Sequence, residues 1–448
     1  MSRLSELAEH VMELSREAGA TDAIAEVIEA HTQQVRYSNS QIDAVNSWTE
    51  NHLALFVAVG KHVVSSDVRD LNSADAYAKD LVEMAKRTPP SKSYGGVASG
   101  KFKYGMARVD KRLVQLRDPS RYALDAIAAA VRAGANNVGG TFFVRHEKVG
   151  LASSGGAVGS DERASADLSV RAFAQPQASG HAVCCTPRLS GMDAGKTGER
   201  AGELAVRAKN PVLGDQGKSD LIMEPLCLGS FVQSTSDMLS ALRVEISTSM
   251  FAKKIGKKVA SNTVTFIDDP TTESTTARLF DHEGVPTRRN IMIKEGVLKR
   301  YFHNTSTAKR FKTKSTANAG PLIPTAFSFA AQPIPLHPVL MPGDWTSDEM
   351  IADTAHGLYL NNTWYTRYQN YVTGEFSSIP RDAILVVEHG EVVGSVKNVR
   401  ISDNMLNLWK SIDALSKNLE EIYWWDEAAP PSHLPVVRAR AMNITKSS

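Results

Sequence analysis

The chain contains few cysteines, no long hydrophobic run and no excess of charge of one sign. It has 3 cysteines in 448 residues, and two of them, Cys184 and Cys185, are neighbours, between which an unstrained disulfide is not expected. This usage predicts a reducing compartment. No apolar run approaches the roughly 20 residues of a membrane span, and the amphipathic residues 1–19 lack the apolar segment of a signal peptide. We therefore expect a cytoplasmic protein with no membrane partner.

The charge balance gives no argument for nucleic-acid binding. Lys and Arg together number 51 and Asp and Glu number 49, so the formal net charge is +2. Proteins that bind nucleic acids usually carry a basic patch or stripe. The composition therefore predicts no nucleic-acid partner, and a hydrophobic fraction of 42% predicts folded cores rather than disorder.

Histidine pairs at helical spacing are also missing from the sequence. None of the 12 histidines lies within five residues of another, so no helix presents two imidazoles on one face. All three cysteines precede residue 228. We expect neither a metal site nor a catalytic residue in this chain, and three histidines spread over separate loops are the alternative.

Residues 1–211 show the same series of predicted elements twice. A helix, four strands and a second helix are expected in the unit 1–90 and again in the unit 118–211, and the turns 19–21 and 134–136 mark the same place in both. The predicted strands are 23–37, 42–48, 53–59 and 62–68 in the first unit, and 138–145, 149–153, 164–174 and 180–186 in the second. The pattern predicts an α+β domain with an internal duplication, and chance alternation of helices and strands is the alternative.

A second domain is expected from residue 212 to residue 425. A long helix at 224–242 is followed mainly by strands, and Glu295-Gly296 between two apolar runs indicates a hairpin. The pattern predicts a β-rich domain with mixed and antiparallel sheets, so the whole chain is assigned to the α+β class. Residues 426–448 are expected to form a poorly ordered tail.

The stretch 263–320 carries the most specific series of motifs. Its first strand ends at Asp268-Asp269-Pro270. The pieces that follow are the turn 280–287 (FDHEGVPT), the hairpin 295–298 (EGVL), the helix start 306–308 (STA) and the loop 315–320 (STANAG). In this order they resemble the TldD/PmbA family, also named the modulator-of-DNA-gyrase family. His282 stands where many relatives have Asp, and Ala317 stands where they have Gly.

The resemblance implies a metallopeptidase relative that lacks the metal motif. The active branch of the family is a zinc peptidase with an HExxxH helix and a cysteine ligand nearer the C-terminus. The matching helix here, 224–237, contains no histidine, and no cysteine follows Cys227. The chain therefore resembles the PmbA/TldE branch, which implies no cofactor of its own and zinc on a TldD-like HExxxH subunit.

For function, the resemblance implies a non-catalytic subunit of a cytoplasmic metallopeptidase complex that degrades unfolded peptides within an enclosed cavity. The complex would be a heterodimer with the TldD-like chain, or a homodimer. Two alternatives stay open. An active metallopeptidase with an unrecognised zinc site would use His282 or His303 as ligands, and a peptide-binding or regulatory module would have no protease partner.

The segment 362–377 contains the candidate peptide-binding residues. It is dense in aromatic and amide side chains, and it resembles the family's segment ending in Thr-Gly-Asp-Phe/Tyr-Ser, with Glu375 in place of Asp. Exposed Trp, Tyr and Arg anchor interfaces, and an exposed strand can pair with an extended peptide. The candidates are Tyr365, Arg367, Asn370, Tyr371, Thr373, Gly374 and Ser377. The alternative is that the aromatic residues fill the core of the second domain.

A second candidate segment is the polar turn 281–283. Asp281, His282 and Glu283 are residue types that bind metals or polarise a carbonyl. The alternative interpretation is a polar turn that caps a strand.

Overall fold

The N-terminal sheet is built from two units with the same order of elements. The computed structural model describes residues 2–322 and 331–446. The first unit comprises α1 (Arg3–Glu17), β1 (Asp22–Ser38), β2 (Gln41–Val59), β3 (His62–Val68), the short 3-10 helix η1 (Leu71–Ser73) and α2 (Ala74–Arg87). The second comprises α4 (Ser120–Arg132), β4 (Asn137–Ser153), β5 (Val158–Ala174), β6 (Ala178–Thr186), η2 (Leu189–Gly191) and α5 (Ala194–Arg207), and α3 (Lys111–Val114) lies between the units. The six strands form one antiparallel sheet in the order β3-β2-β1-β4-β5-β6.

Each unit contains three strands, so the prediction of four is wrong. The polar residues 49–52 and 146–148, expected to separate two strands, continue β2 and β4 without a break. They pair in full ladders with β1 and β5. Polar residues favour a loop when the sequence is read alone, but a strand tolerates them wherever a face of an antiparallel sheet meets water or carries ion pairs.

The two units coincide at an offset of 115 residues. Shifting Asp22–Ser38 by 115 gives Asn137–Ser153, the bounds of β1 and β4. These two strands pair antiparallel with His31 opposite His146, which again lies 115 residues further along the chain. A local two-fold axis between these histidines therefore relates the two halves of the sheet.

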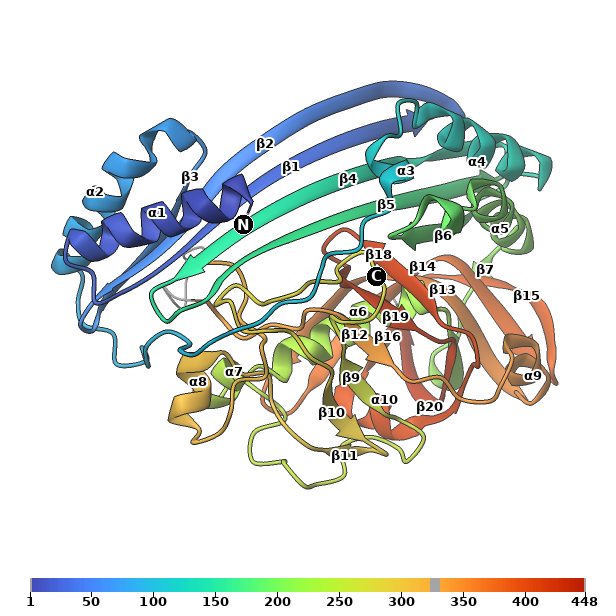
Figure 1. The fold of residues 1–448 in the computed structure, drawn as a ribbon. Coiled ribbons are helices and arrows are strands. Elements are labelled where there is room, and N and C mark those ends of the chain that lie inside the picture. Colours follow the sequence, from blue (N-terminus) through green and yellow to red (C-terminus); the bar gives the residue numbers. More distant parts are fainter. Residues whose placement is uncertain (1, 323–330, 447–448) are drawn as a thin grey trace.

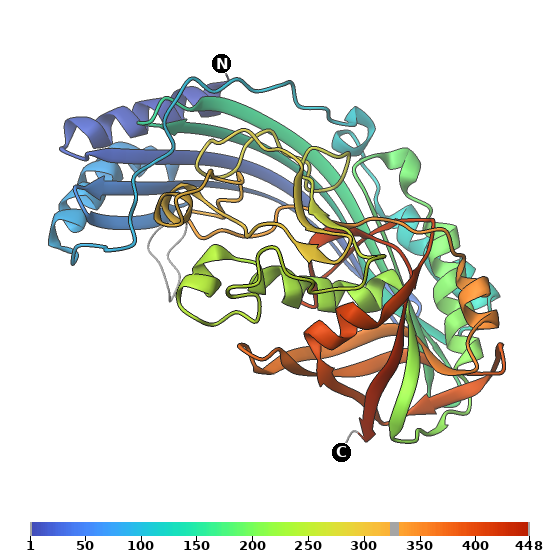
Figure 2. The same cartoon turned by 90° about the horizontal axis from the view of Figure 1, so that it is seen from below.

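The N-terminal sheet arches over the rest of the chain (Figure 1). Helices α1 and α2 lie at one end of the arch and α4 and α5 at the other, and the C-terminal elements occupy its concave side (Figures 1 and 2). On that side Ile28 and Phe56 of the sheet belong to the same buried cluster as Phe280 from the C-terminal part. The two parts of the chain therefore share an apolar contact.

Two further sheets form the C-terminal part, which has the mixed pairing predicted for a β-rich α+β region. The first runs β11 (Val297–Leu298), β10 (Asn290–Lys294), β9 (Phe266–Asp268), β12 (Pro338–Leu340), β19 (Ala428–Leu434) and β18 (Glu420–Trp424). The second runs β13 (His356–Asn370), β8 (Gly217–Met223), β20 (Val437–Lys446), β16 (Val399–Asn404), β14 (Glu375–Glu388), β15 (Glu391–Lys397) and β7 (Val212–Leu213), with β17 (Ile412–Leu415) beside β20. Because β13 also pairs with β14, five strands of this sheet form a closed ring.

Helix α6 (Pro225–Met238) lies within the largest apolar cluster, together with residues from both C-terminal sheets. The remaining helices are α7 (Ala241–Glu245), α8 (Thr305–Arg310), α9 (Ser347–Ala352) and α10 (Met405–Ser411). The predicted hairpin is present between β10 and β11, where Glu295 and Gly296 have φ angles of 50° and 78° that suit a tight turn. Among the described residues, no helix combines the length and the apolar composition needed to cross a membrane.

The prediction of a poorly ordered tail after residue 425 is wrong. Residues 428–434 form β19 and residues 437–446 form β20, which lies between β8 and β16. Residues 447 and 448, which belong to the same predicted tail, lie outside the described residues. Proline and arginine suggest a solvated tail when the sequence is read alone, but here they belong to strands inside two sheets.

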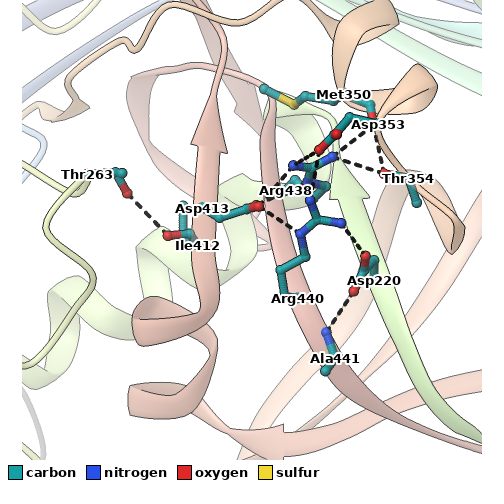
Figure 3. A network of polar contacts seen from close by, with 10 residues as sticks. All are labelled: Asp220, Thr263, Met350, Asp353, Thr354, Ile412, Asp413, Arg438, Arg440 and Ala441. Atoms are coloured by element: carbon teal, nitrogen blue, oxygen red, sulfur yellow. Dashed lines mark hydrogen bonds and ion pairs between the residues drawn. The ribbon is translucent and has the colours of Figure 1, made fainter. Parts of the chain in front are cut away.

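A network of ion pairs explains how arginines enter this sheet (Figure 3). Arg438 is 1% exposed, and its guanidinium donates to Asp413 at 3.0 and 2.9 Å and to Asp353 at 2.8 Å. Arg440, two residues further along β20, donates to Asp413 at 2.7 Å and to Asp220 at 2.6 Å. Three aspartates from other elements thus pair both cations, which makes burial of the arginine tolerable.

Candidate functional site

The polar turn 281–283 is buried between the N-terminal sheet and the loop that follows Thr316. The carboxylate of Asp281 accepts hydrogen bonds from the backbone N–H groups of Glu283 at 3.0 Å, Val285 at 2.9 Å and Ala319 at 3.0 Å. These bonds occupy both carboxylate oxygens within the turn and the neighbouring loop. For Asp281 the geometry is that of a structural turn.

His282 joins this turn to the N-terminal sheet. Its Nδ1 donates to Oε2 of Glu26 on β1 at 2.7 Å, and its Nε2 accepts from Arg278 at 3.1 Å, because a guanidinium can only donate. Burial alone would raise the pKa of Glu26, but the interaction with His282 and the nearby charge of Arg278 outweigh it, so this pKa lies below its ordinary value. Both imidazole nitrogens are therefore engaged within the protein.

Glu283 retains a proton more readily than an ordinary glutamate. Its Oε2 accepts from the backbone N–H of Thr305 at 2.9 Å. Burial, and after it the neighbouring Asp281 carboxylate, raise the pKa of Glu283. The turn thus combines one proton-retaining carboxyl group with the Glu26–His282 link.

The predicted peptide-binding segment forms the tip of the β13–β14 hairpin. Five of its candidates are exposed, namely Tyr365, Arg367, Asn370, Tyr371 and Thr373, whereas Gly374 and Ser377 are buried. Gly374 has a φ of 88°, and a Cβ there would lie 2.8 Å from the sulfur of Met250. Ser377 accepts a hydrogen bond from Arg400 at 3.2 Å. The two buried candidates therefore belong to the framework of the hairpin.

The aromatic residues of this segment divide between the core and the surface. Trp364 and Tyr368 pack against the C-terminal core, while the side chains of Tyr365 and Tyr371 are 49% and 47% exposed. The ring of Trp364 also contacts two other aromatic rings. Its centroid lies 5.5 Å from that of Tyr365, which is tilted, and 5.4 Å from that of Trp424 of β18, which meets it edge to face. We call Trp364, Tyr365, Trp424 and the adjacent Trp425 the aromatic shelf.

Helix α6, which contains most of the segment 224–237 that the resemblance matches to an HExxxH helix, is engaged in packing. Ser230 shares a hydrogen bond of 2.7 Å with Thr363, Thr235 accepts from the indole of Trp409 at 2.8 Å, and Gln233 accepts from the backbone of Ala429 at 3.0 Å. Each of these polar side chains thus has a partner from a neighbouring element.

Zinc does not fit this helix. Its residues supply no imidazole, and at Gly229 an added Cβ would lie 2.6 Å from Ile422 and 2.8 Å from Ala428, so the helix and the β18–β19 hairpin leave no room for a ligand side chain. Elsewhere in ranges 2–322 and 331–446, no three His, Cys, Asp or Glu residues gather closely enough to hold a metal ion. His303 is buried, and its Nδ1 lies 3.3 Å from the hydroxyl of Thr307.

Two adjoining cavities lie between the concave face of the N-terminal sheet and the β18–β19 hairpin. The aromatic cavity, of about 220 Å³, is lined by Phe143, Leu168, Trp424 and Trp425 among others. The arginine cavity, of about 250 Å³, is lined by Arg145, Arg163, Arg278, Glu147, Thr275 and Cys185 among others. Arg145, Asp167 and Tyr423 line both cavities. Because these three residues line both cavities, the two cavities are adjacent.

None of the cavity residues was among the candidates predicted from the sequence. The signal present was alternation along β4, where Phe143, Arg145 and Glu147 occupy one face of a strand. The alternation does not show which residues from distant parts of the chain pack opposite this face of β4. Cys185 does not add a nucleophile, because burial raises its pKa well above the ordinary value and keeps the thiol protonated.

The fold places the chain in a known structural class. It superposes on TldE from Thermococcus kodakarensis with a TM-score of 0.86 at 19% identity, covering 97% of this chain and 99% of that one. A putative modulator of DNA gyrase from Bacteroides thetaiotaomicron gives a TM-score of 0.84 at 18% identity, covering 100% and 99%. At such identities the likeness shows a common fold.

Sequence comparison identifies the family. Residues 216–446 match the family model described as the PmbA/TldA metallopeptidase C-terminal domain, and residues 111–209 match the corresponding central domain. The chain belongs to the PmbA/TldD family, as its motifs predict.

Curated relatives match over part of their length. A metalloprotease from Methanocaldococcus jannaschii is 29% identical over 236 residues, which cover 48% of this chain and 49% of the relative. A metalloprotease TldD homolog from Buchnera aphidicola is 30% identical over 177 residues, which cover 39% and 35%. The chain thus matches about half of the length of these relatives, or less.

Proposed function

We propose that this chain is a non-catalytic, PmbA/TldE-like subunit of a cytoplasmic metallopeptidase complex. In this proposal a TldD-like HExxxH chain holds the zinc, and the two chains together enclose unfolded peptide substrates. The present chain contributes a wall of that enclosure and holds the substrate. The exposed candidates Tyr365, Arg367, Asn370, Tyr371 and Thr373 are proposed as part of the substrate-holding surface.

One observation carries the proposal. In the segment that the resemblance matches to the metal-binding helix, Ser230 and Thr235 hydrogen-bond to Thr363 and Trp409, and Gly229 is closely covered by Ile422 and Ala428. A helix that bound catalytic zinc would need to present its ligands to an open coordination position. The packing of α6 in this chain therefore supports the proposal that a partner chain carries the chemistry.

The alternative of a rearranged zinc site would require His282 or His303. Both nitrogens of His282 are already hydrogen-bonded, one to a carboxylate and one to a guanidinium. Recruiting this imidazole would leave Glu26 without its closest partner in a buried environment. We therefore favour the subunit proposal.

The test is reconstitution with a matched partner. The chain is purified alone and together with an HExxxH member of the family from the same genome, and zinc content, elution volume and cleavage of an unfolded casein substrate are measured. We expect little zinc and no cleavage from the chain alone, and a co-eluting complex whose cleavage is abolished by a chelator. As a control, the Glu of the partner's HExxxH motif is changed to Gln, which should abolish cleavage without preventing assembly.

The proposal fails if the chain alone carries about one zinc ion and cleaves casein in a chelator-sensitive manner. Peptide binding without any co-eluting HExxxH chain would favour the regulatory-module alternative.

A further inference from the structure

We propose that the aromatic and arginine cavities together form one binding site for a short peptide segment. An apolar side chain of the segment lies beside Trp425 and Phe143, and a carboxylate lies beside Arg145 and Arg278. The inference rests on the proposed function in one respect, the choice of a peptide as ligand. The site belongs to this chain alone and needs neither zinc nor a partner.

The aromatic cavity presents an indole in an unusual position. Trp425 is 66% exposed and has a φ of 46°, a left-handed conformation that residues other than glycine, asparagine and aspartate rarely adopt. Exposure of a large apolar side chain and a left-handed backbone are each unfavourable for the isolated chain. Their combination at the rim of a cavity indicates selection for contact with a ligand rather than for stability.

Tyr365, whose ring contacts Trp364, repeats this combination on the aromatic shelf. It has a φ of 55° and is 49% exposed. Its backbone N–H donates to Oε2 of Glu427 at 3.2 Å, and Glu427 lies two residues after Trp425 in the β18–β19 turn. This hydrogen bond joins the backbone of the β13–β14 hairpin to the turn that carries Trp425.

Arg145 connects the two cavities. Its guanidinium lies 4.3 Å from the centre of the Phe143 ring in the aromatic cavity, and it also pairs with Asp167. A stacked arginine keeps its planar fork oriented and retains donors beyond those used by one carboxylate. The guanidinium of Arg145 can therefore contact an apolar group in the aromatic cavity and an anion in the arginine cavity.

The arginine cavity contains more cationic than anionic side chains. Three arginines line it against two carboxylates, Glu147 and Asp167, which pair with Arg163 and Arg145. The third guanidinium, Arg278, donates to the neutral ring nitrogen of His282, and its Nε is buried without a hydrogen-bond partner. A buried unpaired donor is unfavourable, so Arg278 has hydrogen-bonding capacity that the described residues do not use.

The two inner arginines also repel each other. Burial, and after it the charge of Arg278, lower the pKa of Arg163 to about 9. The carboxylates of Glu26, Asp161, Asp268 and Asp281 offset part of the charge of Arg278. A carboxylate placed between the arginines would relieve their repulsion and form the charge-assisted bonds that this fork geometry favours.

Calorimetric titration of the full chain with three tripeptide probes tests the inference. The probes are acetyl-Ala-Phe-Ala with a free carboxylate, the same peptide as its C-terminal amide, and acetyl-Ala-Phe-Glu amide. We expect the free carboxylate to bind at least about tenfold more tightly than the amide. Binding of the Glu peptide at the level of the free carboxylate would identify an acidic side chain as an equally good source of the anion, and weak binding would identify the peptide C-terminus.

Two variants assign the contacts. Trp425→Gly suits the left-handed backbone and should weaken all three probes about tenfold while keeping the ratio of acid to amide. Arg145→Gln removes a cation that would contact the carboxylate, so the affinities for the free acid and for the amide should become nearly equal. Phe173→Ala, which removes another exposed aromatic ring from the N-terminal sheet outside both cavities, is the control and should leave binding unchanged.

Equal affinity for acid and amide, or unchanged binding by Trp425→Gly, would overturn the inference. Absence of binding by all probes would overturn it as well, and would leave the proposed function intact if the chain still assembles with an active HExxxH partner. Failure of that assembly, with probe binding as expected, would reject the proposed function alone.

Discussion

The two halves of the N-terminal sheet share one backbone plan and differ in the side chains on the concave face. At the offset of 115 residues, Thr32 opposite Trp48 in the first half corresponds to Glu147 opposite Arg163 in the second. The β1–β2 and β4–β5 pairs have the same register at these positions, but only the second half carries this ion pair. The two halves thus share a backbone plan at these positions, and the second half adds an ion pair where it lines the arginine cavity.

Both halves are also fastened to the C-terminal part by a buried polar link, and the two links differ in kind. The first half uses the charged Glu26 with His282. In the second half, Asn361 of β13 forms a neutral link, because it accepts from the backbone N–H of His181 and donates to its carbonyl, each at 2.8 Å. This half also carries an ion pair between Arg171 and Asp382 at 3.1 Å. Removing one partner of each link should therefore have unequal effects.

The largest effect is expected for His282→Ala. This change leaves Glu26, which is 4% exposed, without its hydrogen-bond donor, and a buried carboxylate that loses its partner typically costs about 3–5 kcal/mol. Urea unfolding measures the change in the free energy of unfolding. The matched control is Thr141→Ala, 115 residues after Glu26, for which we expect less than about 1 kcal/mol. A loss below about 1 kcal/mol for His282→Ala would contradict the importance of the charged link.

A smaller loss, about 2–3 kcal/mol, is expected for Asn361→Ala. The variant leaves both backbone groups of His181 unpaired, and each buried unpaired group costs about 1–3 kcal/mol unless it finds another partner. Thermal unfolding compares it with Asn46→Ala, which removes an exposed amide bonded to Gln34. Similar stabilities of the two variants would show that the neutral link contributes little.

Glu283→Gln should show an effect on stability that depends on pH. Because the pKa of Glu283 in the folded chain is raised above its ordinary value of 4.5, the folded chain holds a proton that the unfolded chain releases. The wild-type chain therefore loses stability as the pH rises above about 4.5, and glutamine does not. Melting temperatures are measured at about pH 4.5, 6 and 8. The melting temperature of the variant should rise relative to that of the wild-type chain with each increase in pH. A constant difference across this range would refute the raised pKa.

The smallest effect concerns the cross-strand pairs themselves. A double-mutant cycle on Glu147 and Arg163 should give a coupling energy of about 0.5–1 kcal/mol, and the same cycle on Thr32 and Trp48 should give about 0.2 kcal/mol. Equal couplings would mean that the charge in the second half does not distinguish it energetically from the first.

The sequence supports the family, the α+β class and the repeated order of elements, because these depend on local patterns. The turns at 19–21 and 134–136 and the hairpin at Glu295-Gly296 contain residues whose conformational preferences are short-range. Polar residues within β2 and β4 led to the wrong prediction of four strands per unit. Their pairing partners lie on other strands and cannot be recognised from the local sequence. The arginines of β20 misled the prediction of a tail for the same reason, because Asp220, Asp353 and Asp413 come from distant elements.

The peptide-binding residues named from the sequence stay a prediction, and the cavities were not predicted. Tyr365 and Tyr371 are exposed, as binding residues should be, but the cavities require β4, the loop around Arg278 and the β18–β19 hairpin to meet. More than 100 residues separate each of these segments from the next, and no alternation within one segment reveals the others. Such long-range contacts are set by packing of the sheets rather than by local sequence.

The position of β20 has a consequence for the order in which the chain folds. This strand follows every other strand in the sequence, yet it lies between β8 and β16 and supplies the buried Arg438. During synthesis the N-terminal sheet can form as soon as β6 has emerged from the ribosome. The closed ring of the C-terminal part must wait until residues 437–446 have emerged, and until then the facing edges of β8 and β16 are open to pairing with other chains.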